Sequence, residues 1–170
     1  MAPAVYVRDR RSPKPKDERT SALMSRIRSR DTGPERVMRR LLSEAGVRGY
    51  RLHHAGTEGR PDIAFPGRRV AVFIHGCFWH VCPHCKRYAP KNNARFWSEK
   101  LERNRLRDQR KTNCLRVAGW RVVTIWECRL KSYPAAQVGR VLQALSRAES
   151  DRRPKSRAKK RFSNVQKKRN

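Results

Sequence analysis

Three cysteines lie close together near the middle of the sequence. Cys77, Cys82 and Cys85 are spaced C-x4-C-x2-C, and His80 and His84 lie between them. Sulfur and imidazole ligands at such short spacing are typical of tetrahedral zinc sites, and a structural site needs four ligands. The spacing therefore predicts a zinc site that takes one more ligand from elsewhere in the chain.

Cys128 is the preferred fourth ligand. It follows an apolar run over 121–126, which predicts a buried strand that can lie beside another predicted strand, over 69–75. Metal binding would then join the ends of two neighbouring strands. Two alternatives stay open, because His84 could replace Cys82 as a ligand, or the cysteines could be unrelated core residues.

Acidic residues are scarce, and one of them stands at the start of an apolar strand. Asp62 follows the turn-forming residues 59–61 and precedes the apolar residues 63–65. A carboxylate in such surroundings needs a cation or hydrogen-bond donors. Asp62 is therefore our leading candidate for a magnesium ligand, and the alternative is an ordinary turn residue of a Pro-Asp pair.

Two histidines flank an aromatic pair in the string HGCFWH, residues 75–80. A histidine near its ordinary pKa of about 6.5 can take a proton from water at neutral pH. His75 and His80 are therefore candidates for acid-base chemistry beside Asp62. For His80 the alternative is zinc ligation or packing.

Two bulky aromatic pairs lie in segments rich in arginine and lysine. Phe78 and Trp79 follow a predicted strand, and Phe96 and Trp97 lie near the start of a predicted helix. Apolar wedges of this kind insert between base steps in some DNA-binding proteins. The alternative is that both pairs belong to the core.

The elements that must position these residues can be read from hydrophobic spacing and turn residues. The pattern predicts a small α/β sandwich around a mixed sheet. Cys114 falls inside the longest predicted helix and is expected to be a small buried hydrophobic residue. The expected elements are a helix from 31–34 to Gly46, strands at 50–53, 62–65, 69–75 and 121–126, a helix over 94–118, and a helix from Pro134 that buries Val138, Val141, Leu142 and Leu145.

The charge balance points to a polyanionic partner. The 170 residues include 43 Lys or Arg and 14 Asp or Glu, a formal net charge of +29. We expect a basic N-terminal arm over 1–20, one domain over 21–150 and a basic C-terminal arm over 151–170, with +17 of the charge on the domain. Neither a signal sequence nor an apolar run of about 18 residues is present, so a cytoplasmic, nucleoid-associated protein without a membrane segment is expected.

Four motifs in order resemble one enzyme family. The strings GRPD, FIHGCFWH, FWSEKLERNRLRDQR and GWRVVTIWEC resemble the very short patch repair (Vsr) endonucleases, which nick DNA at T:G mismatches left by deamination of 5-methylcytosine. The resemblance runs from about Thr20 to Leu145. It implies a restriction-endonuclease-like sandwich, a mixed central sheet flanked by helices, with a structural zinc site.

The resemblance also implies roles for the residues of a catalytic centre. Asp62 matches the aspartate that holds catalytic magnesium. His80 matches the histidine that deprotonates or orients the attacking water, and Asp108 matches an aspartate that pairs with it. His75 matches a second histidine near the phosphate, and Glu35 a helix glutamate that contacts a metal-bound water.

On the DNA side, Phe78, Trp79 and Trp97 match aromatic residues that intercalate beside the mismatch. Asn104 matches an asparagine near the substrate. Lys100, one turn before it on the same predicted helix, is expected to contact DNA as well.

The chain departs from the family pattern at three places. Ile74 replaces a frequent threonine, so only its backbone carbonyl could help to hold the catalytic metal. Cys77, Cys82, Cys85 and Cys128 fall on the family's zinc site, where the second position is often histidine. The long basic C-terminal arm lies outside the resemblance.

The resemblance thus implies a strand-specific nick 5′ to the thymine of a T:G mismatch, made by a magnesium-activated water. A functional link to a cytosine-5 DNA methyltransferase and a monomeric state are expected. Two alternatives are a restriction-like nuclease for another modified or damaged DNA sequence, and a non-catalytic zinc-containing DNA-binding module.

Overall fold

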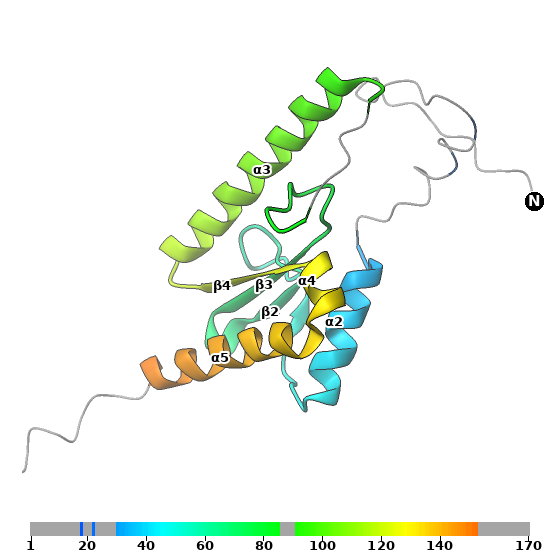
Figure 1. Ribbon diagram of the computed structural model, residues 1–170. Helices are drawn as coiled ribbons and strands as arrows, with labels where there is room; N and C mark the ends of the chain where they lie inside the picture. The colour runs from blue at the N-terminus through cyan, green and yellow to red at the C-terminus, as the bar shows by residue number, and fades with distance from the viewer. Residues whose placement is uncertain (1–17, 19–21, 23–29, 86–90, 153–170) are drawn as a thin grey trace, which may run out of the picture.

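The computed structural model describes residues 18, 22, 30–85 and 91–152 (Figure 1). Its helices and strands, in chain order, are α2 (Gly33–Glu44), β1 (Arg51–Leu52), β2 (Ile63–Phe65), the 3-10 helix η1 (Pro66–Arg68), β3 (Val70–His75), α3 (Ala94–Val117), β4 (Arg121–Trp126), α4 (Glu127–Ser132) and α5 (Pro134–Arg152).

The strands form one mixed sheet in the order β1-β2-β3-β4. The pairs β1–β2 and β2–β3 are antiparallel, whereas β3 and β4 are parallel, with Val70 opposite Arg121 and His75 opposite Trp126. A parallel pair needs a long crossover connection, and α3 lies within it. The predicted neighbourhood of these two strands and the mixed α/β architecture are confirmed.

Both faces of β3 are covered, which explains its continuous apolar sequence. Val72 and Ile74 pack into the main core with α2 and α5. Ala71 and Phe73 point to the opposite face and pack with Leu115 near the end of α3. Figure 1 shows the same division, with α2 and α5 on one side of the sheet and α3 on the other.

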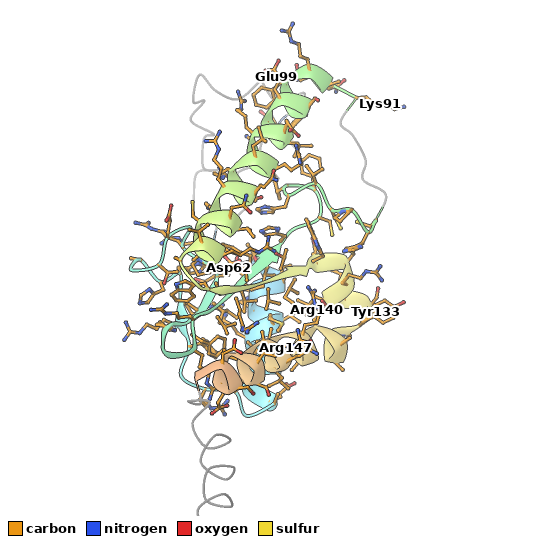
Figure 2. All side chains as sticks on the ribbon, turned by 90° about the vertical axis from the view of Figure 1, so that its left-hand side faces the viewer. Asp62, Lys91, Glu99, Tyr133, Arg140 and Arg147 are labelled. Atoms are coloured by element: carbon orange, nitrogen blue, oxygen red, sulfur yellow. The ribbon has the colours of Figure 1, made fainter. Side chains whose placement is uncertain are left out.

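Helix α3 is attached to the sheet near its C-terminal end. Leu115 is the buried residue of this 24-residue helix, whose length is about 36 Å at 1.5 Å per residue. Figure 2 shows Lys91 and Glu99 at the end remote from Asp62 and the sheet. The first half of α3 therefore projects beyond the main core.

Three details differ from the sequence-based expectations. Cys114 is exposed rather than buried, because α3 packs on the sheet through Leu115 and the thiol faces another direction. Leu142 is also exposed, whereas Val141 and Leu145 are buried as predicted. Helix α4 was not predicted.

The predicted arms lie almost wholly outside the described residues. Helix α5 continues to Arg152, so it includes the first two residues assigned to the C-terminal arm. Within the described ranges, every helix is too short or too polar to cross a membrane.

Candidate active site and metal centre

A pocket of about 950 Å³ opens at the C-terminal end of β3. Its walls come from the start of α2, the loop before β2, the end of β3 and the loop after it, residues 104–111 of α3 and the start of α4. All the residues with a predicted catalytic role line this pocket, namely Glu35, Asp62, His75, His80 and Asp108. The fold therefore brings together residues that are distant in sequence.

Asp62 immediately precedes β2, and the antiparallel pairing with β3 places it beside Ile74. The backbone N–H of Ile74 donates to Asp62 Oδ2 at 2.7 Å. Burial raises the pKa of Asp62 to about 6, although the hydrogen bond from Ile74 opposes the shift. A buried carboxylate that resists ionisation gains much from a nearby cation.

His80 and Asp108 form a close pair. His80 Nδ1 lies 2.5 Å from Asp108 Oδ2, so the Nδ1–H group of the ring donates a hydrogen bond to the carboxylate. Burial disfavours the charge of Asp108, but the hydrogen bond and charge of His80 outweigh it and lower the pKa of Asp108. The arrangement leaves Nε2 of a neutral His80 as a proton acceptor.

His75 is buried and stacks on His80, with ring centroids 4.0 Å apart and planes at 7°. Burial, followed by the charge of His80, lowers the pKa of His75 to about 4. His75 is therefore neutral at neutral pH. Its Nδ1 atom is buried and has no hydrogen-bond partner among the residues that the structure describes.

Glu35 belongs to the cap of α2. Its carboxylate accepts from Thr32 Oγ1 at 2.8 Å and from the backbone N–H of Asp31 at 3.1 Å, in the manner of a capping box. Glu35 is buried although it is acidic. The helix cap thus fixes a carboxylate at the edge of the pocket.

His53 connects two of these acids and was missed by the sequence analysis. Its Nε2 lies 3.4 Å from Glu35 Oε2, and its Nδ1 lies 3.9 Å from Asp62 Oδ1. The backbone N–H of His53 donates to the Asp62 carbonyl, which extends the β1–β2 ladder. The sequence offered one signal for His53. Residues 50–53 and 62–65 are both predicted strands, and an antiparallel pairing between them places His53 opposite Asp62.

The four cysteines predicted to bind zinc converge in a second place. The sulfur atoms of Cys77, Cys82, Cys85 and Cys128 all lie within 4.8 Å of one another. The backbone N–H of Cys128 donates to Cys77 Sγ at 3.3 Å, and that of His84 donates to Cys82 Sγ at 3.4 Å. Cys82, and not the ring of His84, belongs to this group of four.

The aromatic pairs form one half-buried cluster between the loop after β3 and the first half of α3. Phe78 and Trp79 each contact Trp97, with centroids 5.6 and 5.9 Å apart, and Phe96 also contacts Trp97, with centroids 5.4 Å apart. The ammonium of Lys100 lies 5.4–5.8 Å from the rings of Trp79, Phe96 and Trp97. The cluster is separate from both described core clusters.

Asn104 attaches this aromatic cluster to the pocket. Its side-chain amide donates to the backbone carbonyl of Trp79 at 3.1 Å, and both residues line the pocket. The residues predicted to contact DNA therefore continue directly from the residues predicted to be catalytic.

Comparison with known proteins gives a consistent result. Residues 14–87 match the family model described as DNA mismatch endonuclease Vsr. The chain is 45% identical to the type II nicking enzyme V.XorIIP of Xanthomonas oryzae over 76% of this chain and 91% of that protein. It is 43% identical to the type II nicking enzyme V.NaeI of Lentzea aerocolonigenes over 68% of this chain and 71% of that protein.

A further relative is the DNA mismatch endonuclease Vsr of Escherichia coli, which is 39% identical over 64% of this chain and 69% of that protein. The family model and the nicking-enzyme relatives agree with the motifs and with the pocket that they build. The chain belongs to the Vsr family of DNA mismatch endonucleases and is a hydrolytic DNA endonuclease.

Proposed function

We propose that this endonuclease makes a magnesium-dependent, strand-specific nick 5′ to the thymine of a T:G mismatch, in very short patch repair. The observation that carries the proposal is the convergence of Asp62, His80 and Asp108 on one pocket. The match to a family model of mismatch endonucleases supports the choice of substrate.

The acidic residues of the pocket suit a magnesium ion, because Mg²⁺ prefers oxygen ligands. The carboxylate of Asp62 and the backbone carbonyl of Ile74 would hold it. When bound, magnesium polarises the scissile phosphate and stabilises the leaving oxygen. Ile74 has no side-chain oxygen, so its contribution is limited to the backbone.

His80 has the position and the tautomer of a general base. With Nδ1–H donated to Asp108, its Nε2 takes a proton from the attacking water. Asp108 keeps the ring oriented and stabilises the imidazolium that forms. His75 stays neutral against His80, and Glu35 would contact a metal-bound water.

Mismatch selection is assigned to the aromatic cluster. A wobble pair is easier to unstack than a matched pair, so inserting Phe78, Trp79 or Trp97 costs less at a T:G site. Lys100 and Asn104 lie beside these rings and would contact the bound strand. Base contacts would supply the remaining discrimination.

The four-cysteine group fits a structural zinc ion. Four sulfur ligands at mutual distances below 4.8 Å match a closed tetrahedral site, which leaves no position for a catalytic water. The ion would join the loop after β3 to helix α4. It would thereby support the nearby loop residues Phe78, Trp79 and His80.

We infer that the domain is a restriction-endonuclease-like sandwich, which the mixed sheet with helices on both faces supports. A T:G substrate arises from 5-methylcytosine, so a functional link to a cytosine-5 DNA methyltransferase follows. We propose that the enzyme acts as a monomer, and that it is a cytoplasmic protein associated with the nucleoid. The basic arms over 1–20 and 151–170 would add phosphate contacts outside the domain.

A nicking assay tests the proposal. Wild-type protein with Mg²⁺ is expected to nick the thymine strand of a T:G duplex and to leave matched, methylated and uracil-containing duplexes largely intact. Asp62→Ala and His80→Ala should each lower the single-turnover rate by about 10²-fold or more. Asp151→Ala, which removes an exposed acid on α5, is the matched control and should keep the wild-type rate.

Preferred nicking of another lesion would reassign the substrate. If Asp62→Ala nicks as fast as Asp151→Ala, the magnesium assignment is wrong. Nicking that is unchanged when Mg²⁺ is removed would contradict the proposed cofactor.

A further inference from the structure

Arg60 has an unfavourable backbone conformation at the edge of the catalytic pocket. Its φ is 46°, in the left-handed region, although it is not glycine. L residues avoid this region because Cβ approaches the backbone. Arg60 also precedes Pro61, whose ring restricts the preceding residue further.

Neighbouring contacts hold Arg60 in this conformation. Its N–H donates to the carbonyl of Thr57 at 3.1 Å. Thr57 is buried, and its Oγ1 lies 3.0 Å from His54 Nδ1. On the other side, Pro61 is fully buried. The strain is therefore imposed by packing before and after Arg60, as is typical of functional sites.

The same loop is fixed against the helix that carries Asp108. Gly59 has φ of +78°, and a Cβ there would lie 3.1 and 3.3 Å from Cβ and Cγ of Lys111 on α3. This close contact leaves the loop little freedom to move toward α3. The base of the Arg60 side chain thus has a fixed position relative to the His80–Asp108 pair.

Arg60 is exposed and lines the pocket together with Asp62 and His80. No ion pair found in the described part of the chain involves Arg60, whereas the pocket residue Asp31 is paired with Arg39 at 2.7 Å. A guanidinium carries parallel N–H donors that match two oxygens of a phosphate. The pocket is where the scissile strand must lie.

We propose that Arg60 contacts a phosphate of the bound DNA strand in this pocket, and that the strained, packed loop serves to aim it. The inference rests on the proposed function only in placing the DNA backbone in the pocket. It adds a substrate-contacting residue that the family motif leaves without a role.

The chain contains a matched control for this proposal. Arg69 also has a left-handed backbone, with φ of 50°, and is also exposed. It lies between η1 and β3 and does not line the pocket. Replacing either arginine by glycine removes one positive charge and relieves the same kind of strain, but only Arg60→Gly removes the proposed contact.

The experiment compares Arg60→Gly, Arg69→Gly and Arg60→Lys. Glycine tolerates positive φ, so both glycine variants should unfold at or above the wild-type temperature. Arg60→Gly should lower kcat/KM on a T:G duplex on the order of 10- to 100-fold. It should also reduce the salt slope of DNA binding by about one. The salt slope is the slope of the logarithm of the binding constant against the logarithm of the salt concentration, measured without divalent cations. Arg69→Gly should change neither, and Arg60→Lys should lie between wild type and Arg60→Gly.

If Arg60→Gly keeps the wild-type kcat/KM and the wild-type salt slope, the proposal is wrong. Equal losses in Arg60→Gly and Arg69→Gly would also overturn it, because they would reflect charge or chain flexibility alone. If the wild-type protein fails to nick T:G duplexes, the proposed function fails instead, and the salt slopes still decide whether Arg60 contacts a phosphate.

Discussion

Asp62 is poorly suited to the folded protein in the absence of a cation. Burial raises its pKa to about 6 from an ordinary value of 3.8, so folding disfavours the charged carboxylate that the proposed metal binding needs. A site of this kind trades stability for function. The cost in stability can be measured, because the substitution Asp62→Asn removes the charge and keeps the size of the side chain.

Asp62→Asn should stabilise the metal-free protein at neutral pH. The folded-state pKa lies above the unfolded value, so Asp62 contributes no destabilisation below about pH 4 and an increasing one up to about pH 6. Above pH 6 the contribution is constant, and a shift of about two units corresponds to at most about 3 kcal/mol. The asparagine oxygen can still accept the hydrogen bond from Ile74.

Urea unfolding at pH 4 and pH 7.5 checks this expectation. The gain of Asp62→Asn over wild type should be near zero at pH 4 and positive at pH 7.5. A gain that is the same at both pH values would show that charge burial is not its cause.

At the scale of elements, the cysteine group brings together the loop after β3 and helix α4. Cys77, Cys82 and Cys85 lie in the loops that follow β3, and Cys128 lies in α4. Because β3 and β4 are parallel neighbours, their C-terminal ends emerge side by side. A metal ion bound there would cross-link the two strand ends and stabilise the folded state.

Cys128→Ser should therefore release the metal and lower thermal stability, whereas Cys114→Ser should do neither. Cys114 is exposed on α3, outside the group of four, and serves as the matched control. Loss of about 2–3 kcal/mol would lower the unfolding temperature by about 5–10 °C. Metal analysis and thermal unfolding of both variants measure this, and full zinc content in Cys128→Ser would rule out the four-cysteine site.

The first half of α3 contacts the loop after β3 through the aromatic cluster, in which Trp97 packs against Phe78 and Trp79. Trp97→Ala should lower the preference for T:G over matched duplexes by about tenfold, the value of one aromatic stack. Leu106→Ala removes an exposed apolar side chain from the same helix and is the control. Equal losses on mismatched and matched duplexes, measured as kcat/KM, would favour a packing role for Trp97.

The sequence was informative where local chemistry decides structure. Strands β3 and β4 carry β-branched apolar runs, and the α2 cap carries Thr32 and Pro34, so their elements could be predicted. Helix α4 could not, because its six residues follow β4 without a turn signal and are too few to show a helical period.

Side-chain environments were harder to predict than elements. The helical position of Cys114 was correct, but its face was not, since α3 uses few residues to pack. His53 was missed because its position beside Asp62 depends on the pairing of two strands that were predicted only separately. The left-handed backbone of Arg60 was missed because the residue types around it do not indicate a positive φ.

At the scale of the whole molecule, the basic residues lie both in residues 21–150 and in the terminal segments of the chain. Residues 153–170 contain nine basic and no acidic residues, and they lie beyond the end of α5. Charge of this kind binds any phosphate backbone and carries no sequence information. It should therefore affect affinity and selectivity differently.

A chain that ends at Arg152 should bind DNA more weakly and with a smaller salt slope than the full chain. The loss should be equal for matched and T:G duplexes, because selection is assigned to the aromatic cluster of the domain. Binding titrations at several salt concentrations measure both quantities. A changed ratio between the two duplexes would give the C-terminal arm a role in mismatch selection.

The parallel pairing of β3 with β4 also affects the stage of folding at which the enzyme becomes able to cut DNA. Cys77 follows the end of β3 and Glu127 follows the end of β4. These two residues are 50 positions apart in the chain, and the backbone N–H of Cys77 donates to the carboxylate of Glu127. Contacts over such separations form late, after local helices. We therefore expect a nascent or partly folded chain to have the charge that attracts DNA before it has an assembled site that can cut it.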